Sequence, residues 1–301
     1  MENVKNKAIL ISVIVPTYNR AKVIHRAINS VRNQAFGGWE CIIVDDGSTD
    51  NSLEVIQKLI ENDDRFCLIS NERKKGAPGA RNTGILKAQG EYVVLFDSDN
   101  VMHPEFLEKE YNKITREKVD ICGCFSTIID EKTGSAIGKF CWEGYGHIHS
   151  DILRGKSYFD NSSTMIKREK LLGIGLLDED CPSFQEWDTH IRLSGISTYS
   201  TVKEELVDYY RGGSDTISKS QKRSILGQLY ILKKFKGDML KNVPLSYIRH
   251  CLYNYAKIKN LSVGEDRDYL QQLFEKNMNM PFMVLIKMIY PLKVVVKYLK
   301  K

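Results

Sequence analysis

The sequence predicts an α/β domain with a doubly wound, mostly parallel sheet, followed by a helical C-terminal region. Short apolar runs rich in β-branched residues alternate with stretches of helical periodicity, a pattern typical of strands joined by crossover helices. Polar residues cluster directly after three of these runs, and in such sheets ligands bind beyond the carboxyl ends of the strands. With 301 residues, 42% of them hydrophobic, the chain is long enough for one large core and an appended lobe.

The first strands are predicted from four apolar runs, residues 11–15, 41–45, 66–69 and 92–96. Residues 21–34 and 52–62 lie between them and have the spacing of amphipathic helices. The first run leads into the turn sequence Pro16-Thr17-Tyr18-Asn19-Arg20, and the second into Asp45-Asp46-Gly47-Ser48-Thr49-Asp50-Asn51-Ser52. The latter sequence is also typical of a simple capped turn, so it needs support from the other strand ends.

The fourth run ends in the acidic sequence Asp97-Ser98-Asp99. Carboxylates at the end of a strongly apolar strand are costly to bury unless a cation neutralises them. One or two carboxylates together with phosphate oxygens are the usual ligands of Mg²⁺ in such sites. Asp97 and Asp99 are therefore predicted to bind Mn²⁺ or Mg²⁺.

A basic, glycine-rich stretch, residues 74–85, precedes the acidic pair. Glycines such as Gly76 let backbone N–H groups approach a phosphate, and the helix that follows presents its N-terminus to anions. Arg81 is placed to pair either with a diphosphate or with an aspartate of the site. The alternative is a surface loop, which accounts for Lys74 and Lys75 but less well for the rest.

Four segments in this order resemble the motif series of the family 2 glycosyltransferases: residues 13–20, residues 43–50, residues 79–84 and residues 96–99. The resemblance covers about the first two-thirds of the chain. It implies a GT-A fold, a Rossmann-like central sheet flanked by helices, and a metal-dependent enzyme that takes a hexose or N-acetylhexosamine from a nucleotide sugar with inversion.

The resemblance also assigns the donor site. Pro16, Tyr18 and Asp46 correspond to the nucleoside pocket, with Asp46 accepting a hydrogen bond from uracil if the carrier is UDP. Asp97 and Asp99 correspond to the DXD motif, with Asp99 the direct metal ligand. The complete expected set for the donor is Pro16, Thr17, Tyr18, Asn19, Arg20, Asp45, Asp46, Gly76, Arg81, Asp97, Ser98 and Asp99. Guanosine and thymidine carriers remain open.

Residues 182–193 resemble the family segment that carries the general base before an amphipathic helix. The family's acidic pair reads Gln185-Glu186 here, which places the base at Glu186, with Asp188 as the second choice. A carboxylate in this place fits inversion, because a base must take the proton of the acceptor hydroxyl. Without the upstream motifs, both residues would read as acidic side chains that favour a helix N-terminus.

Further features indicate which members of the family the chain resembles. It has neither the Gln-X-X-Arg-Trp motif nor the transmembrane helices of processive members, so we expect transfer of a single sugar. Residues 209–218 resemble the loop where many relatives have a histidine, and here Arg211 and Ser214 are the candidates for phosphate contact. His147 and His149 are interpreted as solvated loop residues in preference to acceptor contacts.

The expected organisation is a catalytic domain, residues 1–218, followed by a helical region, residues 219–301. Within the catalytic domain, about the first 100 residues bind the nucleotide sugar and residues 101–218 bind a glycan or lipid-linked saccharide acceptor. The helical region is predicted to serve homodimerisation or membrane contact. Residues 281–301 mix bulky apolar side chains with five lysines, which favours peripheral contact with an anionic membrane as much as packing.

The amino-acid composition indicates the cellular compartment and the class of protein. Seven cysteines without framework spacing favour a reducing compartment, with Cys122 and Cys124 read as buried strand residues. We expect a cytoplasmic enzyme, peripheral at the inner face of the cell membrane, in the synthesis of capsular or other surface polysaccharide. Basic residues do not interleave with aromatics as in nucleic-acid binding, and no Gly-X-Gly-X-X-Gly follows the first strand. The alternatives are a nucleotidyltransferase and a catalytically inactive nucleotide- or glycan-binding homologue.

Overall fold

The computed structural model describes residues 9–155, 160–212, 220–261, 264–278 and 286–288. Its contacts divide the chain into two compact units. The first comprises residues 1–149, 157–179 and 189–216, and the second residues 150–156, 180–188 and 217–301. Two short stretches from within residues 1–218 thus group with the C-terminal helices, and the functional division predicted above stays a prediction.

The first unit is built on one mixed sheet with the strand order β3-β2-β1-β4-β8-β6-β9-β5, and β7 is paired to β6. Its parallel half consists of β1 (Ile11–Thr17), β2 (Trp39–Asp45), β3 (Phe66–Ser70) and β4 (Tyr92–Leu95). All four predicted strands are therefore present. The apolar, β-branched runs form them because both faces of these strands are covered, as expected for a parallel sheet.

The other half of the sheet adds β5 (Val101–Met102), β6 (Ile121–Asp130), β7 (Ala136–Phe140), β8 (Thr164–Lys167) and β9 (Tyr199–Arg211). Strand β8 runs antiparallel to both β4 and β6, and β9 runs parallel to β6. The carboxyl ends of β1, β2, β4, β6 and β9 therefore point toward the same edge of the sheet.

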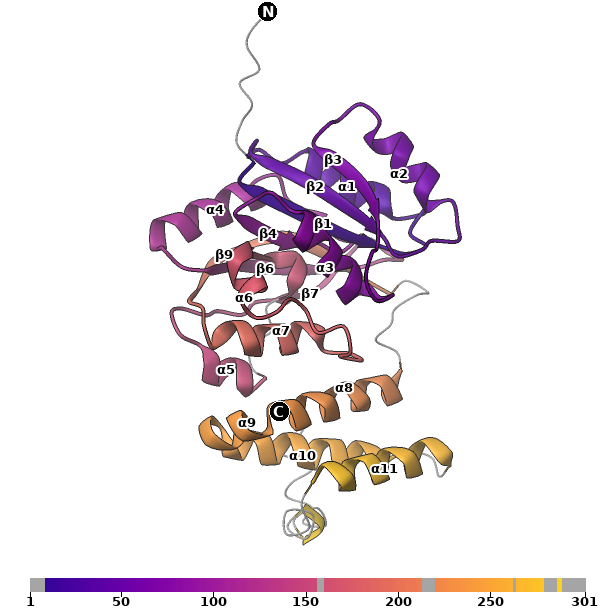
Figure 1. Cartoon of the computed structure of the whole chain (residues 1–301), viewed down its shortest axis with the longest axis vertical. Coiled ribbons are helices and arrows are strands. Elements are labelled where there is room, and N and C mark those ends of the chain that lie inside the picture. Colours follow the sequence, from indigo (N-terminus) through magenta and orange to yellow (C-terminus); the bar gives the residue numbers. More distant parts are fainter. Residues whose placement is uncertain (1–8, 156–159, 213–219, 262–263, 279–285, 289–301) are drawn as a thin grey trace, which may run out of the picture. The chain divides into compact units, whose positions relative to one another are not determined.

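Helices cover the sheet of the first unit, and Figure 1 shows them around its strands. They are α1 (Ile24–Arg32), α2 (Ser52–Ile60), α3 (Ala77–Lys87), α4 (Phe106–Glu117) and α6 (Arg168–Gly173), with the 3₁₀ turn η1 (Asn161–Ser163) before β8. The apolar faces of α1 and α4 pack into the main core, where Ile24, Ile28 and Phe106 are fully or almost fully buried. Cys122 and Cys124 are buried in the same core, as the alternation of their strand predicts.

The second unit is helical. It contains α8 (Gln221–Lys234), α9 (Lys236–Asn242), α10 (Pro244–Lys259) and α11 (Glu265–Asn277), together with most of α5 (His149–Leu153) and the first turn of α7 (Gln185–Ser194). Its core includes Leu232, Tyr247, Cys251, Leu270 and Phe274. No helix in the described part of the chain is both long and apolar enough to cross a bilayer.

Candidate donor site and candidate catalytic segment

The expected donor residues meet at one edge of the sheet of the first unit. Strand β1 lies between β2 and β4, and all three are parallel. The loops after these strands carry residues 16–20, 45–46 and 97–99, respectively. This is where the strand order changes direction, the place at which open α/β sheets bind ligands.

Hydrogen bonds fasten the loop after β1 to the loop after β2. Asn19 has a positive φ of 53°, and its side-chain oxygen accepts a hydrogen bond from the amide of Thr49 at 2.8 Å. The amide of Asn19 donates to Ser48 Oγ at 3.0 Å, and that of Arg20 to Ser52 Oγ at 2.7 Å. Asn19 tolerates the left-handed conformation better than most residues, so it serves here to shape the loop.

Asp45 and Asp46 are neighbours with different environments. Asp45 is buried, and its carboxylate accepts hydrogen bonds from the amides of Gly47 and Ser48 at 3.0 Å, closing its own turn. Asp46 is half-buried, and its two oxygens accept from Asn71 Nδ2 at 2.6 Å and from the amide of Gly76 at 2.8 Å. Asp46 is thus oriented from two sides, whereas Asp45 maintains the turn.

Asn71, which directly follows β3, is a site residue that the sequence analysis missed. Its side-chain oxygen accepts a hydrogen bond from Thr83 Oγ1 of α3 at 2.9 Å, which leaves the amide group to donate to Asp46. Its position at the end of the third parallel strand was the one available signal, since the ends of the other three parallel strands had already been selected on that ground.

The glycine-rich stretch folds as the tight approach to α3 that its composition suggests. Gly76 precedes the helix with φ at 130°, in the region that favours glycine, and gives its amide to Asp46. A Cβ atom on Gly79 would lie 1.9 Å from the carbonyl oxygen of Lys74. Gly76 is therefore favoured by its backbone conformation, and Gly79 by the close packing of this loop.

A second missed residue, Glu179, secures the same loop. Its carboxylate accepts a hydrogen bond from Asn82 Nδ2 at 2.7 Å and is paired with the guanidinium of Arg73. Asn82 is fully buried and also exchanges hydrogen bonds with the backbone of Leu177 at 2.9 Å. These contacts join α3 and the basic loop to a segment about 100 residues further along the chain.

The DXD sequence lies at the end of β4 and is supported by a buried arginine. Arg81, only 4% exposed, forms an ion pair with Asp97, one of the two arrangements predicted for it. Burial raises the pKa of Asp99, and the charge of Asp97 raises it further, while Arg20 and Arg26 act in the opposite direction. A cation bound beside the two carboxylates would offset this unfavourable charge on Asp99.

The backbone of the DXD sequence is held by Ser162 of η1. This hydroxyl accepts hydrogen bonds from the amide of Asp97 at 3.1 Å and from Asn100 Nδ2 at 3.0 Å. Ser162 is fully buried, and Ser98 is only 6% exposed. Nothing in the local sequence identifies Ser162, because it reaches the site from 65 residues away along the chain.

The residues present fit a divalent cation, provided that the ligand contributes oxygens of its own. Carboxylates are the hard oxygen donors that Mg²⁺ and Mn²⁺ prefer. Among the described residues, no group of three or more His, Cys, Asp or Glu side chains is arranged for a metal. Asp97 and Asp99 would therefore supply at most two ligands, leaving coordination positions for phosphate oxygens and water.

Tyr18 presents its ring at the edge of this site. Its side chain is 41% exposed, and the ammonium group of Lys75 lies 4.6 Å from the ring centroid. An exposed aromatic ring at a strand end is available for stacking on a nucleobase.

Glu186 and Asp188 belong to the second unit and lie in the first turn of α7. Glu186 is half-buried. Asp188 is fully buried, and its Oδ1 accepts a hydrogen bond from Lys234 Nζ of α8 at 2.6 Å. A buried carboxylate held by a lysine is suited to a structural ion pair, so Asp188 is the poorer candidate for a base that must meet an acceptor.

The remaining candidates either contact other side chains or lie outside the described residues. Arg211 ends β9 and lies over the rings of Phe140 and Tyr209, whereas Ser214 falls outside the described residues. His147 is exposed, and His149 Nδ1 lies 2.8 Å from Ser194 Oγ.

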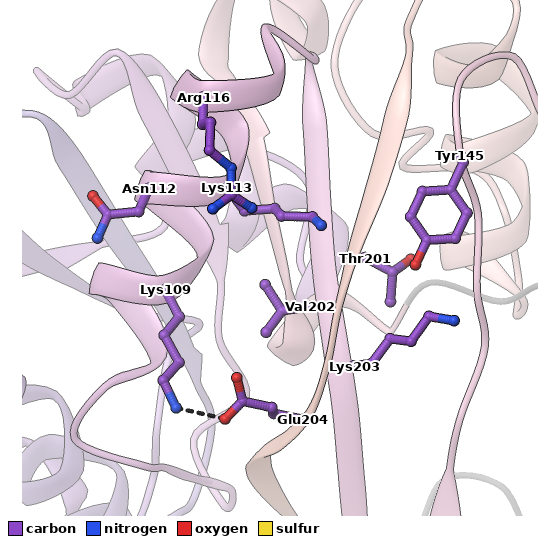
Figure 2. A pocket seen from close by; sticks show the side chains of 9 residues that line it. All are labelled: Lys109, Asn112, Lys113, Arg116, Tyr145, Thr201, Val202, Lys203 and Glu204. Atoms are coloured by element: carbon purple, nitrogen blue, oxygen red, sulfur yellow. Dashed lines mark hydrogen bonds and ion pairs between the residues drawn. The ribbon is translucent and has the colours of Figure 1, made fainter.

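A pocket of about 400 Å³ lies elsewhere in the first unit, between α4 and the first half of β9 (Figure 2). Its lining is basic, but the cations already have carboxylate partners: Lys109 pairs with Glu204, and Lys113 with Glu117. The pocket lies along the first half of β9, toward the amino-terminal ends of the parallel strands. The donor residues follow the carboxyl ends of strands parallel to β9, so this pocket is not part of their site.

Comparisons with known proteins support the motif assignment. Residues 12–172 match the sequence profile described as Glycosyl transferase family 2. The Bacillus subtilis glycosyltransferase TuaG, named for teichuronic acid biosynthesis, is 41% identical over 82% of this chain and 95% of its own. WfgD of Escherichia coli, a UDP-Glc:α-D-GlcNAc-diphosphoundecaprenol β-1,3-glucosyltransferase, is 34% identical over 83% of this chain and 93% of its own. The 38% identical match to GlyG of Streptococcus pneumoniae covers 37% of each chain.

Solved structures share the fold. TarS of S. aureus in complex with UDP-GlcNAc superposes with a TM-score of 0.60 at 19% identity, covering 91% of this chain and 73% of that one. The mannosyltransferase PcManGT of Pyrobaculum calidifontis, in complex with GDP-Man and Mn²⁺, gives a TM-score of 0.58 at 17% identity and covers 96% and 83%. The predicted GT-A fold is confirmed.

Proposed function

This chain belongs to the family 2 glycosyltransferases, and from that premise we propose that it moves a single sugar from a UDP-sugar to a hydroxyl of a lipid-linked glycan, with inversion at the anomeric carbon. The observation that carries the proposal is the pair of anchored carboxylates beside β1. Asp46 is oriented by Asn71 and Gly76, and Asp97 by Arg81. Carboxylates held in this way are preorganised for a ligand.

Each donor residue has a role that its environment supports. Asp46 accepts a hydrogen bond from the N–H of uracil, and the exposed ring of Tyr18 stacks on the base. Asp99 and Asp97 hold the cation, while Arg81 fixes Asp97 and limits the charge that accumulates between the two aspartates. A bound Mn²⁺ or Mg²⁺ would stabilise the negative charge that develops on the departing diphosphate. That WfgD uses a UDP-sugar and TarS binds UDP-GlcNAc supports the choice of UDP.

Glu186 takes the proton of the acceptor hydroxyl. Of the two carboxylates in the first turn of α7, it is the one that is not fully buried, whereas Asp188 is occupied by Lys234. The acceptor class follows the relatives: WfgD is named for a diphosphoundecaprenol-linked acceptor, and TuaG for teichuronic acid biosynthesis. We therefore infer a place in surface-polysaccharide assembly.

The test begins with thermal stabilisation of the purified protein by UDP, GDP, dTDP and their sugars, each with and without Mn²⁺. We expect a Mn²⁺-dependent shift with UDP and UDP-sugars. Asp99→Asn should lose the metal-dependent part, while Asp64→Asn, at an exposed aspartate, should keep it. No shift with any nucleotide would contradict the donor assignment.

The catalytic step is tested with a synthetic GlcNAc-diphosphate lipid as acceptor. Glu186→Gln should bind UDP and Mn²⁺ as the parent protein does and lose at least roughly a hundredfold in turnover, the usual range for a general base. Turnover within a factor of two of the parent would remove Glu186 from the mechanism.

A further inference from the structure

The segment that carries Glu186 packs within the helical second unit. We propose that α8 is a platform that fixes the position of this segment, residues 181–188, and that Gly227 and Lys234 are positioning residues for Glu186. The proposal rests on the function above, in which Glu186 is the general base. It assigns to the C-terminal helices a part in the reaction itself.

The first observation is a close approach at Gly227, in the middle of α8. A Cβ atom there would lie 2.0 Å from Ser183 Oγ, 2.8 Å from the carbonyl oxygen of Ser183 and 3.0 Å from Cδ2 of Phe184. Glycine inside a helix is less favourable than alanine. Here it allows the backbone of the segment to lie directly against the helix.

Two hydrogen bonds fasten the segment at the same place. Ser183 Oγ donates to the carbonyl oxygen of Arg223 at 3.0 Å, and Arg223 Nε donates to that of Pro182 at 2.9 Å. Arg223 lies one helical turn before Gly227, so these bonds and the close approach lie along one side of α8.

The third contact is the ion pair between Asp188, which is fully buried, and Lys234, whose side chain is 30% exposed. It lies at the other end of the segment, two residues after Glu186. Because positions i and i+2 of a helix do not share a face, the side that Asp188 gives to α8 differs from the side of Glu186. The ion pair can therefore set the rotation of the first turn of α7 without occupying Glu186.

The backbone of the segment has an unfavourable conformation at one residue. Phe184 has φ at 60°, a left-handed conformation that is costly for a bulky residue. It is followed at once by the helix, whose Asp188 amide donates to the Phe184 carbonyl oxygen at 3.0 Å. Trp187 adds a hydrogen bond from Nε1 to the carbonyl oxygen of Ile152 at 2.7 Å. The conformation of residues 182–188 is thus imposed by its surroundings within the second unit.

The experiment compares Gly227→Ala with Gly237→Ala, a helical glycine in α9 with no atom within 4 Å of its Cβ position. Gly227→Ala must displace Ser183, and we expect kcat with the GlcNAc-diphosphate lipid to fall at least roughly tenfold, because small misplacements of catalytic groups are costly. The KM for the UDP-sugar and the Mn²⁺-dependent thermal shift with UDP should stay unchanged. Gly237→Ala should match the parent in all three measurements.

Amide hydrogen exchange gives a readout that does not depend on the acceptor. Peptides covering residues 181–190 should exchange faster in Gly227→Ala and in Lys234→Gln than in Gly237→Ala, while peptides covering β1 and β2 stay protected. Ser183→Gly should partly restore kcat in Gly227→Ala, because it removes the atom that lies 2.0 Å from the new Cβ. Lys234→Arg, which keeps the charge, should retain more activity than Lys234→Gln.

The outcomes separate this proposal from the function on which it rests. If Gly227→Ala fails to fold, kcat and amide exchange are compared with Gly237→Ala in two other variants. These are Lys234→Gln and Ser183→Ala, the latter of which removes one hydrogen bond. Unchanged kcat and unchanged exchange in these variants would overturn the platform. If Glu186→Gln retains turnover, the base assignment fails whatever the α8 variants do, and if only Glu186→Gln is inactive, the platform alone is wrong.

Discussion

At the scale of the residue, adjacent side chains of one type have separate tasks because their partners differ. Asp45 closes a turn with amides of its own loop, whereas Asp46 is held by Asn71, directly after β3, and by Gly76, directly before α3. Glu186 and Asp188 differ in the same way, since Lys234 takes the second. The partners of each carboxylate therefore differ even between neighbouring positions of one loop or one helical turn.

We predict that Asn71 contributes to the affinity for the donor, although it lies outside the sequence motifs. Asn71→Ala removes the 2.6 Å hydrogen bond to Asp46, and we expect UDP affinity to fall at least roughly tenfold, as for other hydrogen bonds to a charged group. Isothermal titration with UDP and Mn²⁺ measures the change. Asn112→Ala, at an exposed position on α4, is the control, and equal affinity in both variants would show that Asn71 does not orient Asp46.

A second residue-scale prediction concerns pH. Burial lowers the pKa of His190 to about 3, from its ordinary value of 6.5. The unfolded chain therefore binds a proton below pH 6.5 that the folded protein does not, and stability that is complete above this pH is lost as pH falls toward 3. The loss is at most about 1.4 kcal/mol per pH unit for this one group.

His190→Asn should flatten the dependence between pH 6.5 and 4.5. Urea unfolding of the parent and the variant at several pH values measures it, followed by fluorescence. If the two slopes against pH coincide, another group is responsible for the acid sensitivity.

At the scale of the element, α3 combines two demands that its sequence meets with glycine. The helix must begin beside Asp46, and its first turn must pack against the backbone carbonyl of Lys74. Its buried residue Arg81 then reaches Asp97. The position of the whole helix thus affects both the nucleoside end and the metal end of the donor site.

Gly79→Ala should displace α3, because the new Cβ would lie 1.9 Å from a backbone oxygen. We expect a loss of about 1–3 kcal/mol of stability, as for other overpacked sites, together with weaker UDP binding. Thermal unfolding with and without UDP and Mn²⁺ measures both effects. Gly173→Ala, whose nearest neighbour would be an ordinary 3.8 Å away, is the matched control, and equal melting temperatures would contradict the expected clash.

At the scale of the whole molecule, the two units divide the residues proposed for the reaction. All expected donor residues belong to the first unit, and Glu186 belongs to the second together with the C-terminal helices. The prediction that residues 281–301 serve dimerisation or membrane contact falls on residues outside the described part of the chain, apart from 286–288.

Deletion of residues 281–301 tests that prediction. We expect the truncated protein to lose binding to anionic vesicles, its dimeric state, or both, while UDP and Mn²⁺ still stabilise it, since the donor residues are elsewhere in the chain. Sedimentation with phosphatidylglycerol vesicles and light scattering provide the two measurements. If neither changes, the segment has another task.

The sequence by itself determined the features that depend on local pattern. β-Branched apolar runs specify the four parallel strands, because burial on both faces requires continuous hydrophobic character, and the motifs after them follow from the strand ends. The cluster of Asp46, Arg81, Asp97 and Asp99 could therefore be expected from the sequence alone. The GT-A fold was predicted by the same motifs and is confirmed.

Only the tertiary structure decided which partners those residues have. Asn71, Glu179 and Ser162 reach the donor site from distant positions in the chain, and Lys234 meets Asp188 across 46 residues. No local pattern encodes such pairings, since they depend on how strands and helices pack. The same holds for Gly227, whose lack of a side chain has a consequence only because Ser183 is packed against it.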